Sequence, residues 1–435
     1  MTQVPPHQNV GGSGTSSEPL FKATAAFNSP TPKKIPVRIP LSVPCLGLEE
    51  EQSVMDCVKS GWVSSISPVV KAFENAFAQK LLVPYAIATN TGTSALHLAM
   101  SALGIGPGDE VIVPALTFIA TVNPVRYLGA TPVFVDVEST TFGMNPLAVE
   151  AAITEKTRAI VVAHLYGFPA RIRAIKQIAD KHGLPVIEDA AEALGAAVDG
   201  DFIGTIGTIG CFSFNGNKTI TCGGGGMIVT KDERLAARMQ HLSSQARVID
   251  PECSAEITHD EVGYNCRMTG LQAAVGIAQL GKMDQFLAKK RKIARTYAQT
   301  LSLVPGIQTK YLAEPLVETE PSYWLAVSLL DEPMMRNKII ARALEKGIEF
   351  RPFFKPLPML KPYQPFAKHR YPVAEALWQR GLCMPSCQSM SELQQLEVIH
   401  LLSSELTAFN HDRKKAADFA ISDKRTAYSH VHKRL

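Results

Sequence analysis

Short apolar segments alternate with helix-like segments between residues 85 and 230, and this alternation constrains the fold more than any other feature. Between the apolar runs, residues such as Leu98 and Ala102 recur at helical spacing. Continuous apolar strands are typical of a parallel sheet that is buried on both faces. The pattern therefore predicts an α/β domain with a mostly parallel, seven-stranded sheet between helices. The expected strands are 85–89, 110–113, 132–136, 159–163, 185–188, 211–214 and 226–230.

The second half of the chain has a different order of expected helices and strands. A long helical region is expected at 271–301, and its charge run at 289–292 is interpreted as a solvated helix face. Past Pro305, a strand, a helix and a strand indicate a smaller α+β domain. The expected elements there are 323–330, 336–346 and 348–351, and helices are also expected at 46–60, 68–81, 94–103 and 172–182.

Both ends are expected to be tails. The first residues are rich in Pro, Gly, Ser and Thr and have no hydrophobic period, which is typical of disorder. The last residues are basic, and a solvated tail is favoured there over a short helix or a nucleic-acid contact. The predicted organisation is a disordered tail at 1–38, a large domain at 39–300, a small C-terminal domain at 301–410 and a basic tail at 411–435.

Composition excludes several classes of protein. With 46% hydrophobic and 19% charged residues in 435, wholesale disorder, collagen and coiled coil are ruled out. The net charge of +4 requires no nucleic acid and suits a phosphate-bearing ligand equally well. No signal segment and no membrane span are expected. The eight cysteines form no C-x-x-C pair, so a metal site is not expected. We expect the thiols to be reduced, as in a protein of the cytoplasm.

The common nucleotide and hydrolase motifs are missing. The segment 216–219 resembles the end of a phosphate-binding P-loop, but Asn217 stands where that loop needs glycine. No G-x-G-x-x-G follows a strand, and neither G-x-S-x-G nor H-E-x-x-H occurs. The chemistry must therefore reside in other segments.

Two segments are candidate anion sites at helix starts. In 90–96 a strand ends, Gly92 turns the chain, and Thr93 and Ser94 are expected to cap a helix, whose free N–H groups attract anions. In 263–269, Asn265 and Arg267 precede the long helical region. Simple capping explains either segment as well, and it is the favoured interpretation of the first segment taken alone.

Two further segments carry reactive groups. The strand in 184–192 ends in Glu188 and Asp189, and a carboxylate there can hold a proton on a pyridine-type nitrogen, although a helix-capping Asp is equally plausible. In 211–227, Lys218 lies among apolar residues and glycines. Burial disfavours the charged form of an amine, so this lysine suits a Schiff base better than an ordinary surface position.

Taken together, these segments strongly resemble the DegT/DnrJ/EryC1/StrS family of nucleotide-sugar aminotransferases, over about residues 39–410. The resemblance also includes segments 61–65, 114–120, 164–167, 380–381 and 384–386. It implies a pyridoxal-phosphate-dependent transferase of fold type I and a homodimer with shared active sites. Within the family, the legionaminic-acid pathway aminotransferases and the GDP-perosamine synthases are the most similar subgroups. The glycine run at 223–226 favours the first of them.

The resemblance also implies roles for particular residues. Lys218 forms the Schiff base with the cofactor and then moves the proton, and Asp189 holds the proton of the pyridine nitrogen. Glu192 stands near the ring hydroxyl, where many relatives have Gln or His. The other implied contacts are Gly92, Thr93, Ser94 and Ser213 for the phosphate, Asn265 from the second subunit, Phe118 against the ring, and His164, Tyr323 and Trp324 on the sugar side.

The implied activity moves an amino group from glutamate to the C4 ketone of a UDP- or GDP-linked 4-keto-6-deoxy sugar, for surface-polysaccharide or legionaminic-type sugar synthesis. One lysine serves both halves of this ping-pong reaction as acid and base. Two alternatives remain: a pyridoxamine-dependent sugar dehydratase, in which histidine replaces the lysine, and a non-enzymatic regulator. Lys218 argues against the first, and Lys218 together with Asp189 argues against the second.

Overall fold

The computed structural model describes residues 36–249, 257–313 and 315–432. Most of the expected N-terminal tail thus lies outside the described residues. One compact unit begins at Val37. The backbone N–H groups of Arg38 and Ile39 both donate to the Gly347 carbonyl, at 2.8 and 2.9 Å, which ties this first segment to the C-terminal half of the chain.

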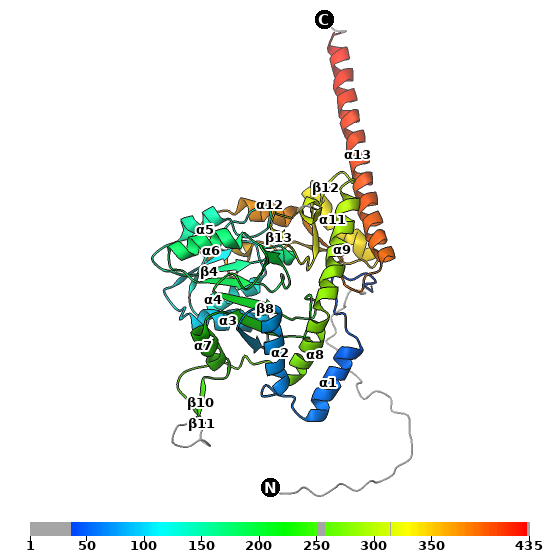
Figure 1. Ribbon diagram of the computed structural model, residues 1–435. Coiled ribbons are helices and arrows are strands. Elements are labelled where there is room, and N and C mark those ends of the chain that lie inside the picture. The colour runs from blue at the N-terminus through cyan, green and yellow to red at the C-terminus, as the bar shows by residue number, and fades with distance from the viewer. Residues whose placement is uncertain (1–35, 250–256, 314, 433–435) are drawn as a thin grey trace, which may run out of the picture. The chain divides into compact units, whose positions relative to one another are not determined.

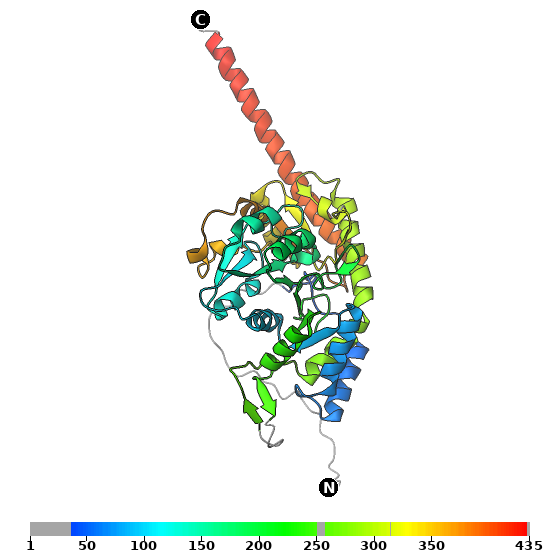
Figure 2. The same ribbon diagram turned by 60° about the vertical axis from the view of Figure 1, so that its left-hand side comes forward.

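The predicted seven-stranded sheet is present (Figures 1 and 2). Its β9 strand runs in the direction opposite to the other strands of this sheet. Alternate residues of β4 belong to two separate hydrophobic clusters, Val161 in one and Ile160 and Val162 in the other, so both faces of the sheet are covered. In spatial order the strands are β1 (Tyr85–Thr89), β9 (Gly226–Thr230), β8 (Ile209–Ser213), β5 (Val186–Asp189), β4 (Thr157–Ala163), β2 (Glu110–Pro114) and β3 (Thr131–Val135).

The helices that were expected before residue 302 begin and end close to the expected positions, with one exception, and the helices at 123–127, 146–152 and 233–243 were not predicted. The long helical region is two helices, α8 and α9, which meet at Lys282. In α2, the Ser67 hydroxyl accepts the Val69 N–H and Pro68 occupies the first turn, which sets its start. The helices are α1 (Leu48–Ser60), α2 (Pro68–Lys80), α3 (Gly92–Ala102), α4 (Asn123–Tyr127), α5 (Pro146–Ala152), α6 (Ile172–Lys181), α7 (Glu233–Ser243), α8 (Gly270–Gly281) and α9 (Met283–Leu301).

The C-terminal part contains a second, four-stranded antiparallel sheet. Its β14 strand begins at Ala326, later than the expected 323, because residues 322–325 bond to the loop after β4 instead. The elements are β12 (Ile307–Gln308), β14 (Ala326–Leu330), β16 (Gly381–Met384) and β15 (Arg351–Pro352), with helices α10 (Lys310–Ala313), α11 (Pro333–Glu345), α12 (Pro372–Arg380) and α13 (Glu392–His432).

Three smaller features complete the described structure. They are a three-stranded sheet, a two-stranded sheet and a set of short 3-10 turns. Among the helices of the described residues, none is both long and apolar enough to cross a membrane. The remaining elements are β6 (Ala197–Val198), β7 (Asp201–Phe202), β10 (Arg247–Ile249), β11 (Ile257–His259), β13 (Thr319–Glu320), η1 (Ile119–Thr121), η2 (Leu165–Gly167), η3 (Leu357–Met359) and η4 (Gln364–Phe366).

Two sequence-based expectations about charged segments need correction. The basic segment after Asn410 is the continuation of α13 to His432 and not a separate tail, because residues 411–432 contain no Pro or Gly to end the helix. In the charge run on α9, Lys292 is exposed as expected, but Lys290 is only 1% exposed. The Lys290 position faces the C-terminal sheet, where its amine donates to two backbone carbonyls.

Burial lowers the pKa of Lys290 to about 7, against about 10.4 for an unfolded lysine. Between these values the unfolded chain binds more protons than the folded one, so stability rises with pH. We therefore expect the free energy of unfolding of the wild type, relative to Lys290→Met, to increase by roughly 2 kcal/mol from pH 7 to pH 9. Urea denaturation of both proteins at the two pH values measures this. A pH-independent difference would contradict the burial of the amine.

Candidate active site

A cavity of about 320 Å³ lies at the carboxyl ends of the central strands. It is bordered by the loops after β2, β4, β5 and β8, by the start of α3, and by residues of the C-terminal part such as Trp324 and Arg351. The crevice at the carboxyl ends of the strands is where open α/β sheets bind ligands. The volume lies within the range typical of small-molecule sites.

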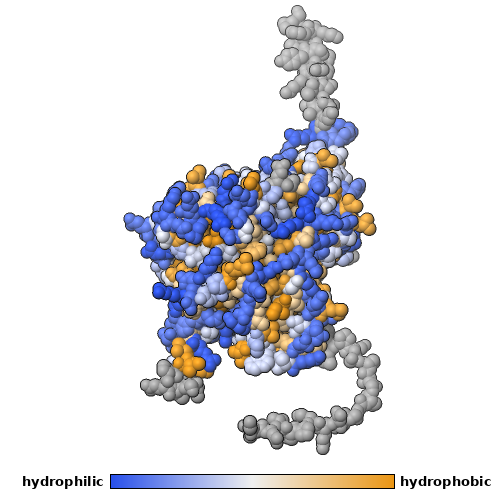
Figure 3. All heavy atoms as spheres, in the orientation of Figure 1, coloured by the Kyte–Doolittle hydropathy of each residue, from blue (hydrophilic) through white to orange (hydrophobic). Residues whose placement is uncertain are grey.

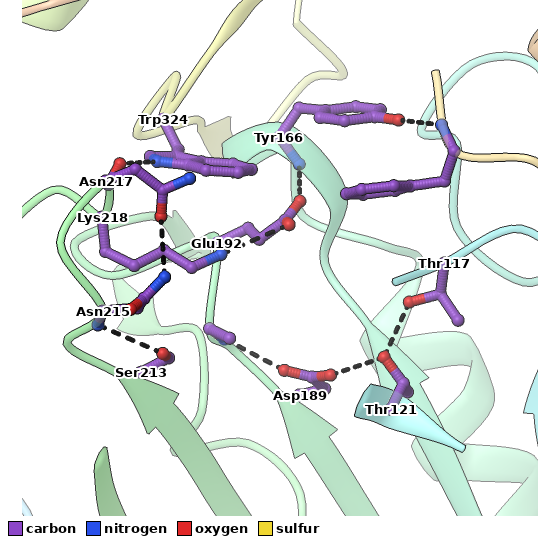
Figure 4. A network of polar contacts seen from close by, with 12 residues as sticks. Thr117, Thr121, Tyr166, Asp189, Glu192, Ser213, Asn215, Asn217, Lys218 and Trp324 are labelled. Atoms are coloured by element: carbon purple, nitrogen blue, oxygen red, sulfur yellow. Dashed lines mark hydrogen bonds and ion pairs between the residues drawn. The ribbon is translucent and has the colours of Figure 1, made fainter. Parts of the chain in front are cut away.

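Asp189, the last residue of β5, forms the floor of this cavity (Figure 4). Its Oδ2 accepts the Thr121 hydroxyl at 2.7 Å, and its Oδ1 accepts the Ala191 N–H at 3.2 Å. The Thr121 hydroxyl is in turn 2.7 Å from that of Thr117. Burial raises the pKa of Asp189, although both hydrogen bonds and the charge of Lys218 act in the opposite direction. The carboxylate is thus held in a fixed orientation inside a largely apolar cavity.

Lys218 points into the same cavity and lies between an aromatic ring and a carboxylate (Figure 4). Its Nζ is 3.9 Å from the centre of the Trp324 ring and 3.4 Å from Glu192 Oε1. The Trp324 indole N–H donates to the Asn217 carbonyl at 2.6 Å, which holds the ring in place. With 13% of its side chain exposed, Lys218 is not an ordinary surface lysine.

Glu192 is buried and joins Lys218 to the loop after β4. Its Oε2 accepts the Tyr166 N–H at 2.9 Å, while its Oε1 faces Lys218. Burial raises the pKa of Glu192, and the positive charge of Lys218 opposes that shift. The acid at this position is therefore held by one backbone donor and one amine.

The start of α3 meets the end of β8 on another wall of the cavity. Thr91, and not Thr93 or Ser94 as expected, is the capping residue, because its hydroxyl accepts the Ser94 N–H at 3.0 Å. A Cβ on Gly92 would lie 2.7 Å from the Cβ of Ser213, so only glycine fits this contact. Thr93 and Ser213 line the cavity together with Gly92, and Ser94 is not among the lining residues.

Four other predicted residues differ in their placement. Phe118 lines the cavity, is 53% exposed, and has its ring centre 5.6 Å from that of Phe354. Trp324 also lines it. Tyr323 is buried outside the lining, where its hydroxyl donates to the Leu312 carbonyl at 3.3 Å. Asn265 is exposed and likewise lies outside the lining.

His164 lines the cavity, but both of its ring nitrogens are already engaged. Its Nδ1 accepts the Ala170 N–H at 3.0 Å, so Nε2 carries the proton and donates to Glu188 at 3.1 Å. Glu188 also accepts backbone N–H groups from Gly204, Ile206 and Gly207. The pair is therefore saturated within the protein and leaves no imidazole nitrogen for a sugar hydroxyl.

The structure adds lining residues that the sequence did not single out. Thr121, Tyr166 and Arg351 lie in short turns or at a strand end, where no periodic pattern marks them. Tyr166 has a positive φ of 57°, a conformation that a tyrosine rarely adopts, and it offers its backbone N–H to Glu192. Positive φ at a tyrosine has no sequence signal.

A family model for DegT/DnrJ/EryC1/StrS aminotransferases matches residues 44–403. This chain belongs to the DegT/DnrJ/EryC1/StrS aminotransferase family. It is 41% identical to a GDP-perosamine synthase from Escherichia coli O157:H7 over 84% of this chain and 97% of that protein. It is also 41% identical to one from Caulobacter vibrioides, over 85% and 98%.

A solved structure of the same kind has a similar fold. A Streptococcus pneumoniae protein described as a sugar aminotransferase, in its PLP form, superposes with a TM-score of 0.79 at 27% identity, over 85% of this chain and 99% of that one. DegT-family aminotransferases are PLP-dependent enzymes of fold type I, so the predicted fold class and cofactor are confirmed. The donors around the cavity fit this cofactor: a buried carboxylate, a primary amine, and a helix start flanked by hydroxyls.

Proposed function

We propose that this DegT-family aminotransferase moves an amino group from glutamate to the C4 ketone of a nucleotide-linked 4-keto-6-deoxy sugar. The observation that carries the proposal is the placement of the Lys218 amine in one cavity with the Asp189 carboxylate. A dehydratase of this scaffold has histidine in place of the lysine. A regulator without activity would not need a buried amine held between Trp324 and Glu192.

Pyridoxal phosphate, when bound, supplies an electron sink and carries the amino group between the two substrates. In this proposal, Lys218 binds the cofactor and moves the proton at its Nζ in both half-reactions. Asp189 holds the proton of the ring nitrogen, and Thr121 and the Ala191 N–H orient that carboxylate. Glu192 lies beside Lys218 and is proposed to face the ring hydroxyl.

The remaining cavity residues are proposed to hold the two ends of the cofactor. Gly92, Thr93 and Ser213 offer backbone and hydroxyl donors for the phosphate at the positive end of α3. Phe118 provides an aromatic face for the ring. Arg351, at the border of the cavity, is a candidate for an anionic substrate group, such as a carboxylate or a diphosphate.

A GDP-linked sugar is the first candidate substrate, because the GDP-perosamine synthases named above align over almost their whole length. A UDP-linked sugar of the legionaminic type is the second. It is favoured by the glycine run at 223–226, of which Gly224 and Gly225 line the cavity. In either case the product would enter surface-polysaccharide or nonulosonic-acid synthesis, and the cytoplasm is the proposed location.

A homodimer is proposed to complete the site, with Asn265 reaching the cofactor of the second subunit. In its neighbourhood, Asn90 Oδ1 and Arg267 Nε are buried and have no hydrogen-bond partner in the described part of the chain. Exposed apolar residues of α1 and the following loop, including Met55, Trp62 and Ile66, offer a surface for a second copy. Figure 3 shows hydrophobic residues among hydrophilic ones in the lower half of the face that contains these elements.

The substrate proposal predicts a clear order among nucleotide sugars. We expect the purified protein, with glutamate and a panel of GDP- and UDP-linked 4-keto-6-deoxy sugars, to aminate the GDP-linked sugar with a 2-hydroxyl at least about tenfold faster than the others. Mass spectrometry of the products measures this. Faster amination of a UDP-linked 2-acetamido sugar would favour the second candidate, and loss of water at C3 without amination would contradict the proposed activity.

A further inference from the structure

One buried lysine is not explained by the proposed chemistry. Lys290 lies on α9 and is 1% exposed, whereas Lys292, two residues further along, is 59% exposed and pairs with Glu392. The Lys290 ammonium donates to the Trp324 carbonyl at 2.9 Å and to the Ser386 carbonyl at 3.0 Å. No carboxylate affects its pKa among the described residues: burial lowers this pKa, and Cys387 is the one titratable group that opposes the shift.

Burying an amine against carbonyls alone is costly, because desolvation disfavours the charged form and no negative charge compensates for it. An apolar side chain of the same length would avoid this cost but would leave the Trp324 and Ser386 carbonyls without this donor. The position is therefore explained better by what the amine holds in place than by its contribution to stability.

The two carbonyls belong to segments that enter and leave the C-terminal sheet beside the cavity. Trp324 precedes β14, and Ser386 follows β16. The Ser386 hydroxyl accepts the Ala326 N–H at 2.7 Å and lies 2.7 Å from the Met384 carbonyl, to which it donates. Lys290 thus fastens the ends of two paired strands to α9 at the point where the Trp324 side chain turns into the cavity.

The same short segment is held from its other side by the loop after β4. The Ser322 N–H donates to the Gly167 carbonyl at 2.9 Å, and the Leu325 N–H donates to the Tyr166 carbonyl at 3.2 Å. A Cβ on Gly167, whose φ is +95°, would lie 2.5 Å from the backbone nitrogen of Trp324. Residues 322–325 are therefore clamped between this loop and Lys290.

Residues 322–325 carry the Trp324 ring, which lies over the amine of Lys218. The Trp324 indole lies over Lys218 Nζ at 3.9 Å and donates to the Asn217 carbonyl at 2.6 Å (Figure 4). An indole face stabilises a positive charge placed over it, so its position affects the protonation of the nitrogen beneath. A shift of the segment would move the ring away from this nitrogen.

We propose that Lys290 is a positioning residue of the amino-transfer site, which holds the Trp324 indole over Lys218. The inference rests on the proposed role of Lys218 but not on the identity of the sugar. Lys290 touches neither the cavity nor Lys218 and acts through the Trp324 backbone.

The test measures how the visible absorption of the cofactor-loaded protein changes with pH, which needs no sugar substrate. We expect Lys290→Met to move the midpoint of this titration to lower pH by about half a unit to one unit, because the indole no longer stabilises the positive charge. Trp324→Phe is expected to move it in the same direction. The double variant is expected to equal Trp324→Phe alone, since Lys290 acts through this ring.

Lys292→Met is the matched control, because it removes an exposed lysine from the same helix, and its midpoint should equal that of the wild type. If Lys290→Met lowers stability but leaves the midpoint unchanged, the role of Lys290 is structural and the proposal is wrong. The proposal would also be wrong if Lys290→Met shifted the midpoint equally in the wild-type protein and in the Trp324→Phe protein. If Lys290→Met does not fold, Lys290→Leu, which also removes the N–H donor, is expected to give a shift of the same sign. The absence of that shift would overturn the proposal too.

These outcomes are separate from those of the proposed function. A protein that aminates an unexpected sugar can still show the titration shift. A protein with the expected sugar specificity can fail to show it.

Discussion

Replacing Lys218 by alanine is expected to reduce amino transfer by at least about 10⁴-fold, with little loss of stability. Lys218 is the only lysine that lines the cavity in the described part of the chain, so no other primary amine can take its place. The loop around it keeps its backbone hydrogen bond to the Asn215 carbonyl in the variant. Formation of 2-oxoglutarate from glutamate, followed together with thermal unfolding, measures both quantities.

Two further variants sharpen this result. Lys218→Arg keeps a positive charge beneath Trp324 but supplies no neutral amine, so it should be as inactive as the alanine variant. Lys292→Ala, on the exposed face of α9, should leave the rate unchanged. Lys218→Ala protein with more than about one hundredth of the wild-type rate would show that the lysine is not the proton carrier.

Asp189→Asn is expected to lower kcat/KM by about 10²- to 10³-fold, as is typical when one preorganised charge is removed from a site. Asparagine has nearly the same shape, and its amide oxygen can still accept the Thr121 hydroxyl, so only the hydrogen bond from the Ala191 N–H should be lost. It lacks the negative charge that holds a proton on a pyridine nitrogen. Steady-state kinetics with glutamate measure the loss.

The matched control for this variant is Asp180→Asn on α6, whose carboxylate is exposed and pairs with Lys176. Its kinetics should equal those of the wild type. If Asp189→Asn stays within about threefold of the wild-type kcat/KM, the carboxylate does not serve the ring nitrogen, and its role is limited to accepting the Thr121 and Ala191 donors.

The positions of Asp189 and Lys218 could be predicted from the sequence because Asp189 ends one buried strand and Lys218 follows another, and the ends of parallel strands meet at one edge of a sheet. The sequence did not indicate which of Glu188 and Asp189 faces the cavity. Successive strand residues face opposite sides of a sheet. Glu188 accordingly binds His164 and three backbone N–H groups, while Asp189 faces the cavity.

The contacts that sequence patterns missed are all tertiary. Lys290 belongs to a run of cations that has the composition of a solvated helix face, and only the packing of the C-terminal sheet on α9 buries it. The position of Trp324 depends on a glycine at residue 167 and on a loop more than 150 residues earlier in the chain. Neither periodicity nor a short motif records such a contact.

We propose above all that the nitrogen of glutamate is transferred to C4 of a nucleotide-linked sugar, and that this transfer requires Lys218 as the proton carrier. The most direct measurement incubates the wild type with ¹⁵N-glutamate and the GDP-linked 4-keto-6-deoxy sugar and follows the label by mass spectrometry and NMR. We expect a product with ¹⁵N bonded to C4 and one equivalent of 2-oxoglutarate, and neither with Lys218→Ala. An unlabelled or dehydrated sugar product, or labelled product from the Lys218→Ala protein, would contradict it.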